Sequence, residues 1–127
     1  MKIAAVQMDF QLKDNAGNVD RMIGKLKTAV GEGARLVIFP ECAVPGYCFD
    51  SLAEALPYGE SVDGPSVAAM TAACQDLNCY TIFGMLERVG EQVVNVAVLT
   101  GPKGVIVAFR DNSFANPQGL VRFVAEQ

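Results

Sequence analysis

The sequence predicts an α/β protein with a mixed β-sheet. Apolar runs typical of strands alternate with segments of helical periodicity up to residue 78, and after that point strand-like runs follow one another directly. Strands separated by a helix pair in parallel, whereas strands joined by short turns pair antiparallel. At 127 residues and 51% hydrophobic composition, the chain fits a single domain, 1–127, that buries a core.

The first half of the chain is predicted to form a strand, a helix and a second strand. Residues 2–8 (KIAAVQM) form the first predicted strand. Asn18 is the predicted N-cap of a helix that ends at the GEG of residues 31–33, with its apolar positions at helical spacing: Val19, Met22, Ile23, Leu26, Ala29 and Val30. Leu36 to Phe39 form the second strand, so the first two strands should be parallel.

A long loop and a second helix follow. Residues 43–65 are rich in Pro, Gly and Asp and predict a loop with one helical turn around 51–56. Asp63 or Ser66 is the predicted cap of a helix that ends at Asn78. Strands are then expected at 79–88, 92–100 and 104–110. The divergent tail, 111–127, is equally compatible with a short docked helix and a terminal strand.

The composition excludes several kinds of partner. A net charge of −4 and a pI near 4.7, with scattered basic residues, leave no basic face for nucleic acid or anionic lipid. The N-terminal run is broken by Gln7 and Asp9 and does not resemble a signal peptide. No apolar run reaches the ~20 residues of a membrane span. We therefore expect no nucleic acid partner, no membrane association and a cytoplasmic location.

The cysteines do not predict a metal site. Cys42, Cys48, Cys74 and Cys79 have spacings that differ from those of common zinc modules, so reduced and mostly buried thiols are expected. The sequence contains no histidine, which removes Ser-His and Cys-His catalytic pairs and His-ligated metals. No metal is therefore predicted.

A carboxylate stands where the second strand should end. In RLVIFPECAVPGYCFD, residues 35–50, Pro40 stops the sheet ladder and Glu41 follows directly at the rim. The rim at the carboxyl ends of strands is where α/β proteins keep their active sites. Glu41 is thus a candidate catalytic residue, and an exposed or capping glutamate remains the alternative.

Four stretches in a set order resemble the first half of the nitrilase, or carbon-nitrogen hydrolase, superfamily. They are KIAAVQM at the start, LVIFPE at the end of the second strand, PGY a few residues later, and VNVAVLTGPKGVI leading to FR. The resemblance covers about residues 1–110. It implies half of an α-β-β-α sandwich, with a mixed sheet, helices on one face, and the other face buried by oligomerisation. It implies no cofactor.

The family's active site, as the resemblance implies it, uses a glutamate base, a lysine and a nucleophilic cysteine to hydrolyse or transfer amide or nitrile groups. Glu41 matches the glutamate. Asp111 stands at the lysine position, where an acid would repel the developing oxyanion. The family's cysteine lies downstream of that lysine, and no cysteine here matches it. Tyr47 is expected to pack at a turn more than to bind a ligand.

Three functions fit these residues. The first is an incomplete hydrolase-like chain, truncated, frameshifted or split, that keeps Glu41 and has no turnover alone. The second is a binding or assembly module, or one subunit of a split enzyme. Its Glu41 pocket would take a small amide, an amine or a cation, or the layer would pair with another polypeptide. The third is a working amidase with Cys42 or Cys48 as nucleophile. Adjacent residues on an extended chain point to opposite sides, so a Glu41–Cys42 contact would require an unusual local turn.

A homo-oligomer, most simply a dimer, is expected through a sheet face. One helical layer covers one face of a sheet, and the strands carry more apolar residues than that layer can bury, among them Ile3, Val6, Val37, Phe39, Ile82, Val94, Val96, Val98, Val105 and Val107. The apolar tail residues Leu120 to Val124 are expected to help seal the interface or an exposed edge. The alternative is that the tail folds back over the open face and caps it within one chain.

Overall fold

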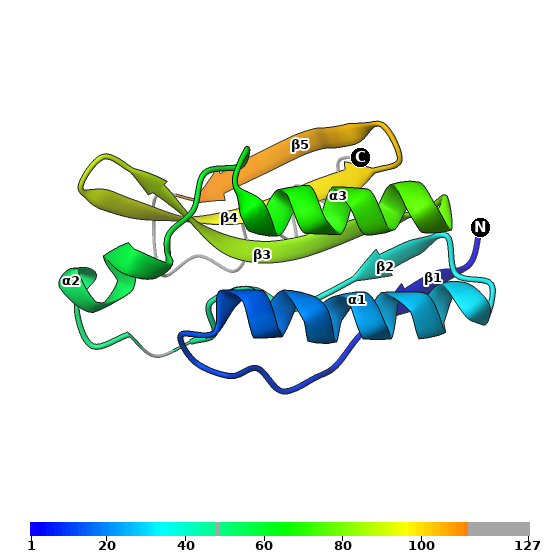
Figure 1. Ribbon diagram of the computed structural model, residues 1–127, viewed down its shortest axis with the longest axis horizontal. Coiled ribbons are helices and arrows are strands. Elements are labelled where there is room, and N and C mark those ends of the chain that lie inside the picture. The colour runs from blue at the N-terminus through cyan, green and yellow to red at the C-terminus, as the bar shows by residue number, and fades with distance from the viewer. Residues whose placement is uncertain (48, 112–127) are drawn as a thin grey trace.

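The computed structural model describes residues 1–47 and 49–111, which form a five-stranded sheet in the order β1-β2-β3-β4-β5 (Figure 1). The strands are β1 (Ile3–Ala5), β2 (Leu36–Ile38), β3 (Tyr80–Val89), β4 (Gln92–Gly101) and β5 (Gly104–Asp111). β1, β2 and β3 are parallel, and β3, β4 and β5 pair antiparallel. The predicted α/β class and mixed sheet are confirmed, although β1 is shorter than the predicted strand at 2–8.

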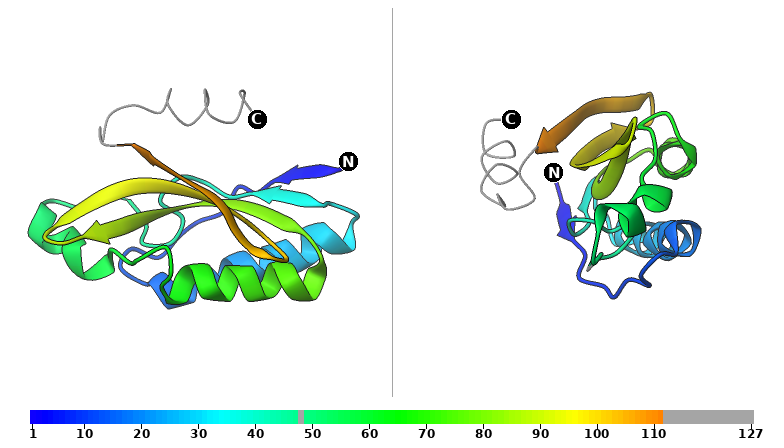
Figure 2. Two further views of the ribbon diagram at one scale, coloured as in Figure 1. Left: turned by 90° about the horizontal axis from the view of Figure 1, so that it is seen from above. Right: turned by 90° about the vertical axis from the view of Figure 1, so that its left-hand side faces the viewer.

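Two long helices, α1 (Asn15–Gly31) and α3 (Pro65–Leu77), lie side by side on one face of the sheet (Figure 2). The loop between β2 and α3 holds the short α2 (Leu52–Ala55) and the 3-10 turn η1 (Leu56–Tyr58), close to the helical turn predicted at 51–56. Figure 1 shows this pair at one end of the molecule, near the start of α1, where Asn15 donates to the Tyr58 carbonyl at 3.0 Å.

The predicted helix caps were wrong. The N-cap of α1 is Asp14, whose side chain accepts a hydrogen bond from the Gly17 amide, and Asn18 is fully buried inside the helix. The N-cap of α3 is Gly64, followed by Pro65 at the first helical position, where its missing N–H costs nothing. The end of α3 at Asn78 is confirmed, because Asn78 adopts the left-handed conformation with φ of 50°.

The core lies between the helices and the sheet face that they cover. Its buried side chains come from α1, α3 and alternate positions of β2, β3 and β4, and include Met22, Leu26, Val37, Met70, Phe83, Met85, Val96 and Val98. Of the apolar strand residues that were expected to exceed one helical layer, Val37, Val96 and Val98 lie on the covered face. These valines are at most 1% exposed beneath α1 and α3.

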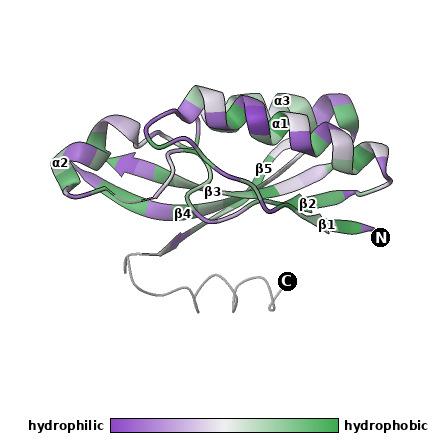
Figure 3. Cartoon of the chain, turned by 90° about the horizontal axis from the view of Figure 1, so that it is seen from below, coloured by the Kyte–Doolittle hydropathy of each residue, from purple (hydrophilic) through white to green (hydrophobic). Residues whose placement is uncertain are grey.

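The sheet face away from α1 and α3, called here the far face, is also apolar. Alternation along the registered strands assigns to it Ile3, Leu36, Ile38, Tyr80, Ile82, Leu99 and Val107. Ile3 is 57% and Tyr80 37% exposed, and the others are half-buried. Figure 3 shows both long helices on the opposite side of the strands.

Within the described residues, no helix combines the length and the apolar character needed to cross a bilayer. The predicted tail, including Leu120 to Val124, lies outside the described residues from position 112 onward.

Candidate active site

Glu41 stands at the carboxyl end of β2, as predicted. The Phe39 amide donates to the Ile82 carbonyl at 2.8 Å, so pairing with β3 continues one residue past the strand. Pro40 has no N–H and cannot extend the ladder. The chain therefore leaves the sheet at Glu41, which is half-buried at the rim.

The turn that carries Glu41 is fixed to β3 through Gly84. The Gly84 amide donates to the Pro40 carbonyl at 3.3 Å, and the Val44 amide donates to the Gly84 carbonyl at 3.1 Å. A Cβ at residue 84 would fall 2.3 Å from the Cys42 amide nitrogen. Glycine is thus needed at 84 because the backbone of the turn presses directly on the strand.

Both oxygens of the Glu41 carboxylate accept a hydrogen bond from a side chain. The Tyr47 hydroxyl donates to Oε2 at 2.6 Å, and the Asn95 amide Nδ2 donates to Oε1 in a very short contact. Asn95 lies on β4, where it pairs with Leu86 of β3. A carboxylate held from two sides by donors on different elements has a fixed orientation, which a general base requires.

Cys42 is buried next to Glu41 and contacts Asn95. Its thiol donates to Asn95 Oδ1 at 3.7 Å. Burial, followed by the negative charge of Glu41, raises the pKa of the Cys42 thiol to about 12. The unusual turn that a Glu41–Cys42 contact would need is present, since Cys42 has a φ of +50°, yet the thiol turns to Asn95. Such a thiol is protonated at neutral pH and is a poor nucleophile.

Tyr47 is more than the turn-packing residue that the sequence suggested. Its side chain is 51% exposed and its hydroxyl reaches Glu41. Burial, then the hydrogen bond to Glu41, raises the pKa of the Tyr47 phenol well above its usual range. The phenol therefore stays neutral and remains a donor at physiological pH. Cys48, the other candidate nucleophile, falls outside the described residues.

These side chains line a cavity of about 200 Å³. Its wall consists of Glu41, Cys42, Gly46, Tyr47, Phe49, Leu86 and Asn95. Phe49 stacks on Tyr58 of η1, with ring centroids 5.8 Å apart and an interplanar angle of 25°. The cavity thus has one polar side, built around Glu41, and one apolar side.

Asp111 ends β5, directly across from Asn95 in the β4–β5 ladder. This register brings the backbone of position 111 beside the strand residue that holds Glu41. The preceding residue, Arg110, forms an ion pair with Glu87. Its Nε lies 2.9 Å from Oε1 and 3.0 Å from Oε2 of Glu87, and its Nη2 lies 2.8 Å from Oε2. Arg110 therefore does not replace the family's lysine at Glu41.

Two polar side chains, the buried Asn18 and the half-buried Glu60, fix the loop around the site, and the sequence analysis did not identify them as anchors. The Asn18 amide donates to the carbonyls of Gln11 and Val44, both at 2.7 Å. Glu60 accepts from the Ser66 amide at 2.9 Å, the Ser66 hydroxyl at 2.6 Å and Asn15 at 2.7 Å. Glu60 thereby caps α3 and joins it to α1.

Asn95 and Gly84 were also missed. Asn95 interrupts the apolar run VVNVAVL, and a lone amide in such a strand is a signal that could have identified it. Gly84 interrupts TIFGML in the same way, because a glycine within a strand often marks close backbone approach. Which partner each one meets is a long-range property that no local pattern contains.

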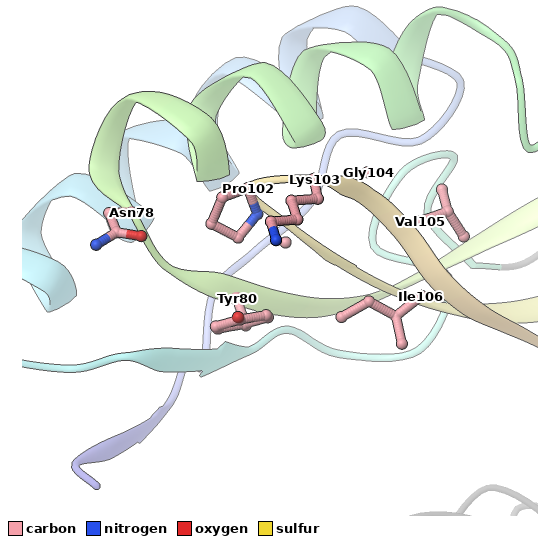
Figure 4. Close-up of a pocket in the computed structure, with 8 residues that line it drawn as sticks. Asn78, Tyr80, Pro102, Lys103, Gly104, Val105 and Ile106 are labelled. Carbon is pink, nitrogen blue, oxygen red and sulfur yellow. The ribbon is translucent and has the colours of Figure 1, made fainter.

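A second cavity, of about 300 Å³, lies at the other end of the sheet (Figure 4). Its lining includes Asn78, Tyr80, Pro102, Lys103 and Ile106, and none of its described lining residues is a carboxylate. Tyr80 begins β3, so this cavity is at the amino end of the parallel strands. Ligands of α/β sheets bind at the carboxyl ends, where Glu41 is.

The structure is thus that of an α/β protein with a candidate general base, a carboxylate that accepts two hydrogen bonds in a cavity at the carboxyl end of a parallel strand. The chain belongs to the carbon-nitrogen hydrolase family, whose sequence pattern matches residues 2–116. It is 30% identical over 111 residues to a nitrilase of Pyrococcus abyssi, covering 87% of this chain and 42% of that protein.

Solved structures agree with this assignment. The chain is similar to an N-terminal amidase crystallised with an Asn-Glu peptide, at 26% identity and a TM-score of 0.74, covering 91% of this chain and 29% of that one. An amidase from Nesterenkonia sp. shares the fold with a TM-score of 0.77 at 21% identity, covering 94% of this chain and 46% of that one. The chain thus spans less than half the length of these relatives.

Proposed function

We propose that this chain supplies the general-base part of an amidase- or nitrilase-type active site that acts on non-peptide C–N bonds. The observation that carries the proposal is the Glu41 carboxylate, held by Asn95 and Tyr47 beside a cavity. A base in this position can take the proton from a nucleophile as it attacks a carbonyl or nitrile carbon.

The 127 residues alone are proposed to have no turnover. Asp111 occupies the position of the lysine that would stabilise the oxyanion, and the buried Cys42 thiol is protonated. Loss of an oxyanion-stabilising group or of a nucleophile costs several kcal/mol of transition-state stabilisation. Buried free thiols at Cys42, Cys74 and Cys79 support a reducing compartment such as the cytoplasm.

The test has two arms. The chain alone is assayed against a panel of small amides and nitriles, and no hydrolysis above background is expected. The Asp111→Lys chain is then co-expressed with the part of the Pyrococcus abyssi nitrilase that follows the matched region. Hydrolysis in that mixture, abolished by Glu41→Gln and retained by the surface control Glu91→Gln, is the supporting result. Turnover by the chain alone that requires Glu41 would overturn the claim of inactivity.

A binding or assembly module, or one subunit of a split enzyme, is the second candidate, favoured by the far face. Ile3 and Tyr80 are substantially exposed there. Exposed apolar patches of this kind mark interaction sites. Two copies could bury these side chains against each other, which supports a homodimer as the assembly.

A further inference from the structure

Among the described residues that line the cavity beside Glu41, Glu41 is the one carboxylate and there is no Lys or Arg. The Cys42 thiol and the Tyr47 phenol both have a raised pKa and are neutral at physiological pH. The ion pairs found in residues 1–47 and 49–111 all join other residues: Lys13–Glu54, Arg21–Asp14, Arg88–Glu91 and Arg110–Glu87. A half-buried carboxylate without a cation favours a positively charged ligand.

The hydrogen-bonding groups of the cavity also favour a ligand that donates hydrogen bonds. Each Glu41 oxygen accepts one side-chain hydrogen bond, and a carboxylate has about four acceptor positions in all. Within residues 1–47 and 49–111, Asn95 Oδ1 accepts from the Cys42 thiol at 3.7 Å and from no other group, and a thiol is a weak donor. Acceptor capacity thus remains on two neighbouring side chains. An ammonium group, with three donors and no acceptor, complements it better than an amide does.

The rest of the wall fits the apolar part of such a ligand. Leu86 is 1% exposed and Phe49 is braced by its stacking on Tyr58. Tyr47 adds a second aromatic ring beside the carboxylate, and aromatic faces attract cations. A cavity of about 200 Å³ limits the ligand to a short chain or a single ring.

We infer that this cavity binds a primary alkylammonium ion, with its nitrogen at Glu41 and Asn95 and its alkyl chain against Phe49 and Leu86. The inference goes beyond the proposed function, because binding of this kind requires neither a nucleophile nor the family's lysine. It can hold where hydrolysis is absent, and it can fail where co-expression restores hydrolysis.

An NMR titration of the complete, ¹⁵N-labelled chain tests the inference with three probes. Butylammonium has the charge and the N–H donors, butyramide is its neutral analogue, and tetramethylammonium has the charge without a donor. Because hydrogen bonds to charged groups are stronger than neutral ones, butylammonium should bind about tenfold more tightly than butyramide. Its binding should also exceed that of tetramethylammonium, and the Asn95 side-chain amide signals should move during the titration.

Matched variants separate the site from the overall charge. Glu41→Gln should remove the preference for butylammonium, whereas Glu91→Gln, which causes the same change in net charge at a side chain 86% exposed, should retain it. Equal or tighter binding of butyramide, absence of butylammonium binding, or a preference that survives Glu41→Gln would each overturn the inference. The three probes on the unmodified chain decide the matter even if Glu41→Gln fails to fold.

Discussion

Gly84 of β3 and Cys42 of the turn after β2 lie so close that a methyl group on residue 84 would approach the Cys42 amide nitrogen to 2.3 Å. The added methyl group would meet backbone atoms of the turn, so no side-chain rotation can relieve the contact. It sets how deeply the turn sits on the sheet, and thereby where Glu41 meets Asn95. The candidate site depends on a residue that has no side chain of its own.

Gly84→Ala should displace this turn and destabilise the protein. Overpacking in a closely packed region typically costs about 1–3 kcal/mol of unfolding free energy. Denaturant unfolding measures this cost, and the Asn95 side-chain amide signals should shift as the contact with Glu41 changes. Gly24→Ala is the matched control, because nothing lies within 4 Å of a Cβ there. In the interior of α1 that change should stabilise by up to about 1 kcal/mol. Equal effects of the two substitutions would refute the steric argument.

Alkaline pH should destabilise the fold through its buried thiols. Burial raises the pKa of Cys42 and of Cys74 to about 12, against a usual value of about 8.5 in the unfolded chain. Between these values the folded thiols keep protons that the unfolded chain has released, so stability decreases as pH rises from about 9 to about 12. Each thiol should contribute at most about 1.4 kcal/mol per pH unit.

Chemical denaturation at a series of pH values measures this dependence. Cys42→Ala should reduce the slope, since the variant lacks one of the buried thiols whose pKa is raised. An unchanged slope in the variant would show that Cys42 does not titrate as its burial implies.

Glu60 should be a strong determinant of stability despite its position in a loop. Its carboxylate accepts hydrogen bonds from Ser66 and Asn15 and joins the starts of α1 and α3. Glu60→Ala leaves these donors without their partner and removes a helix cap, at a cost of about 1–3 kcal/mol. Thermal or denaturant unfolding measures it. Glu91→Ala, at an exposed ion pair, should stay within about 0.5 kcal/mol of the unmodified protein.

Self-association through the far face is expected at micromolar concentration. Sedimentation equilibrium should show a dimer of the 13.5 kDa chain, and Ile82→Asp should dissociate it without unfolding, because the substitution places a charge on the far face. Val89→Asp, at an exposed residue at the end of β3, should leave the dimer intact. Val96→Asp would instead unfold the protein, since Val96 is buried under the helices. A monomer at all concentrations would rule out the homodimer.

The sequence by itself determined the order of the elements and the place of Glu41. Helical spacing, the left-handed Asn78 and the Pro40–Glu41 break are local signals, because backbone geometry and propensity act over a few residues. Those signals were less reliable for caps. Asn18 is a residue type common at N-caps, but here it lies inside the helix and its amide donates to the Val44 carbonyl. Local sequence preferences cannot predict a contact between residues so far apart in the chain.

Only the tertiary structure decided which sheet face the helices cover and which residues meet Glu41. Strands such as LVIF and VAVL are apolar at successive positions, so alternation cannot tell the covered face from the far face. Asn95 is 54 residues from Glu41 along the chain, and their hydrogen bond exists because β3 pairs with both β2 and β4. Strand pairing and the backbone contact at Gly84 are long-range interactions. They bring Asn95 to Glu41 and so create the candidate site.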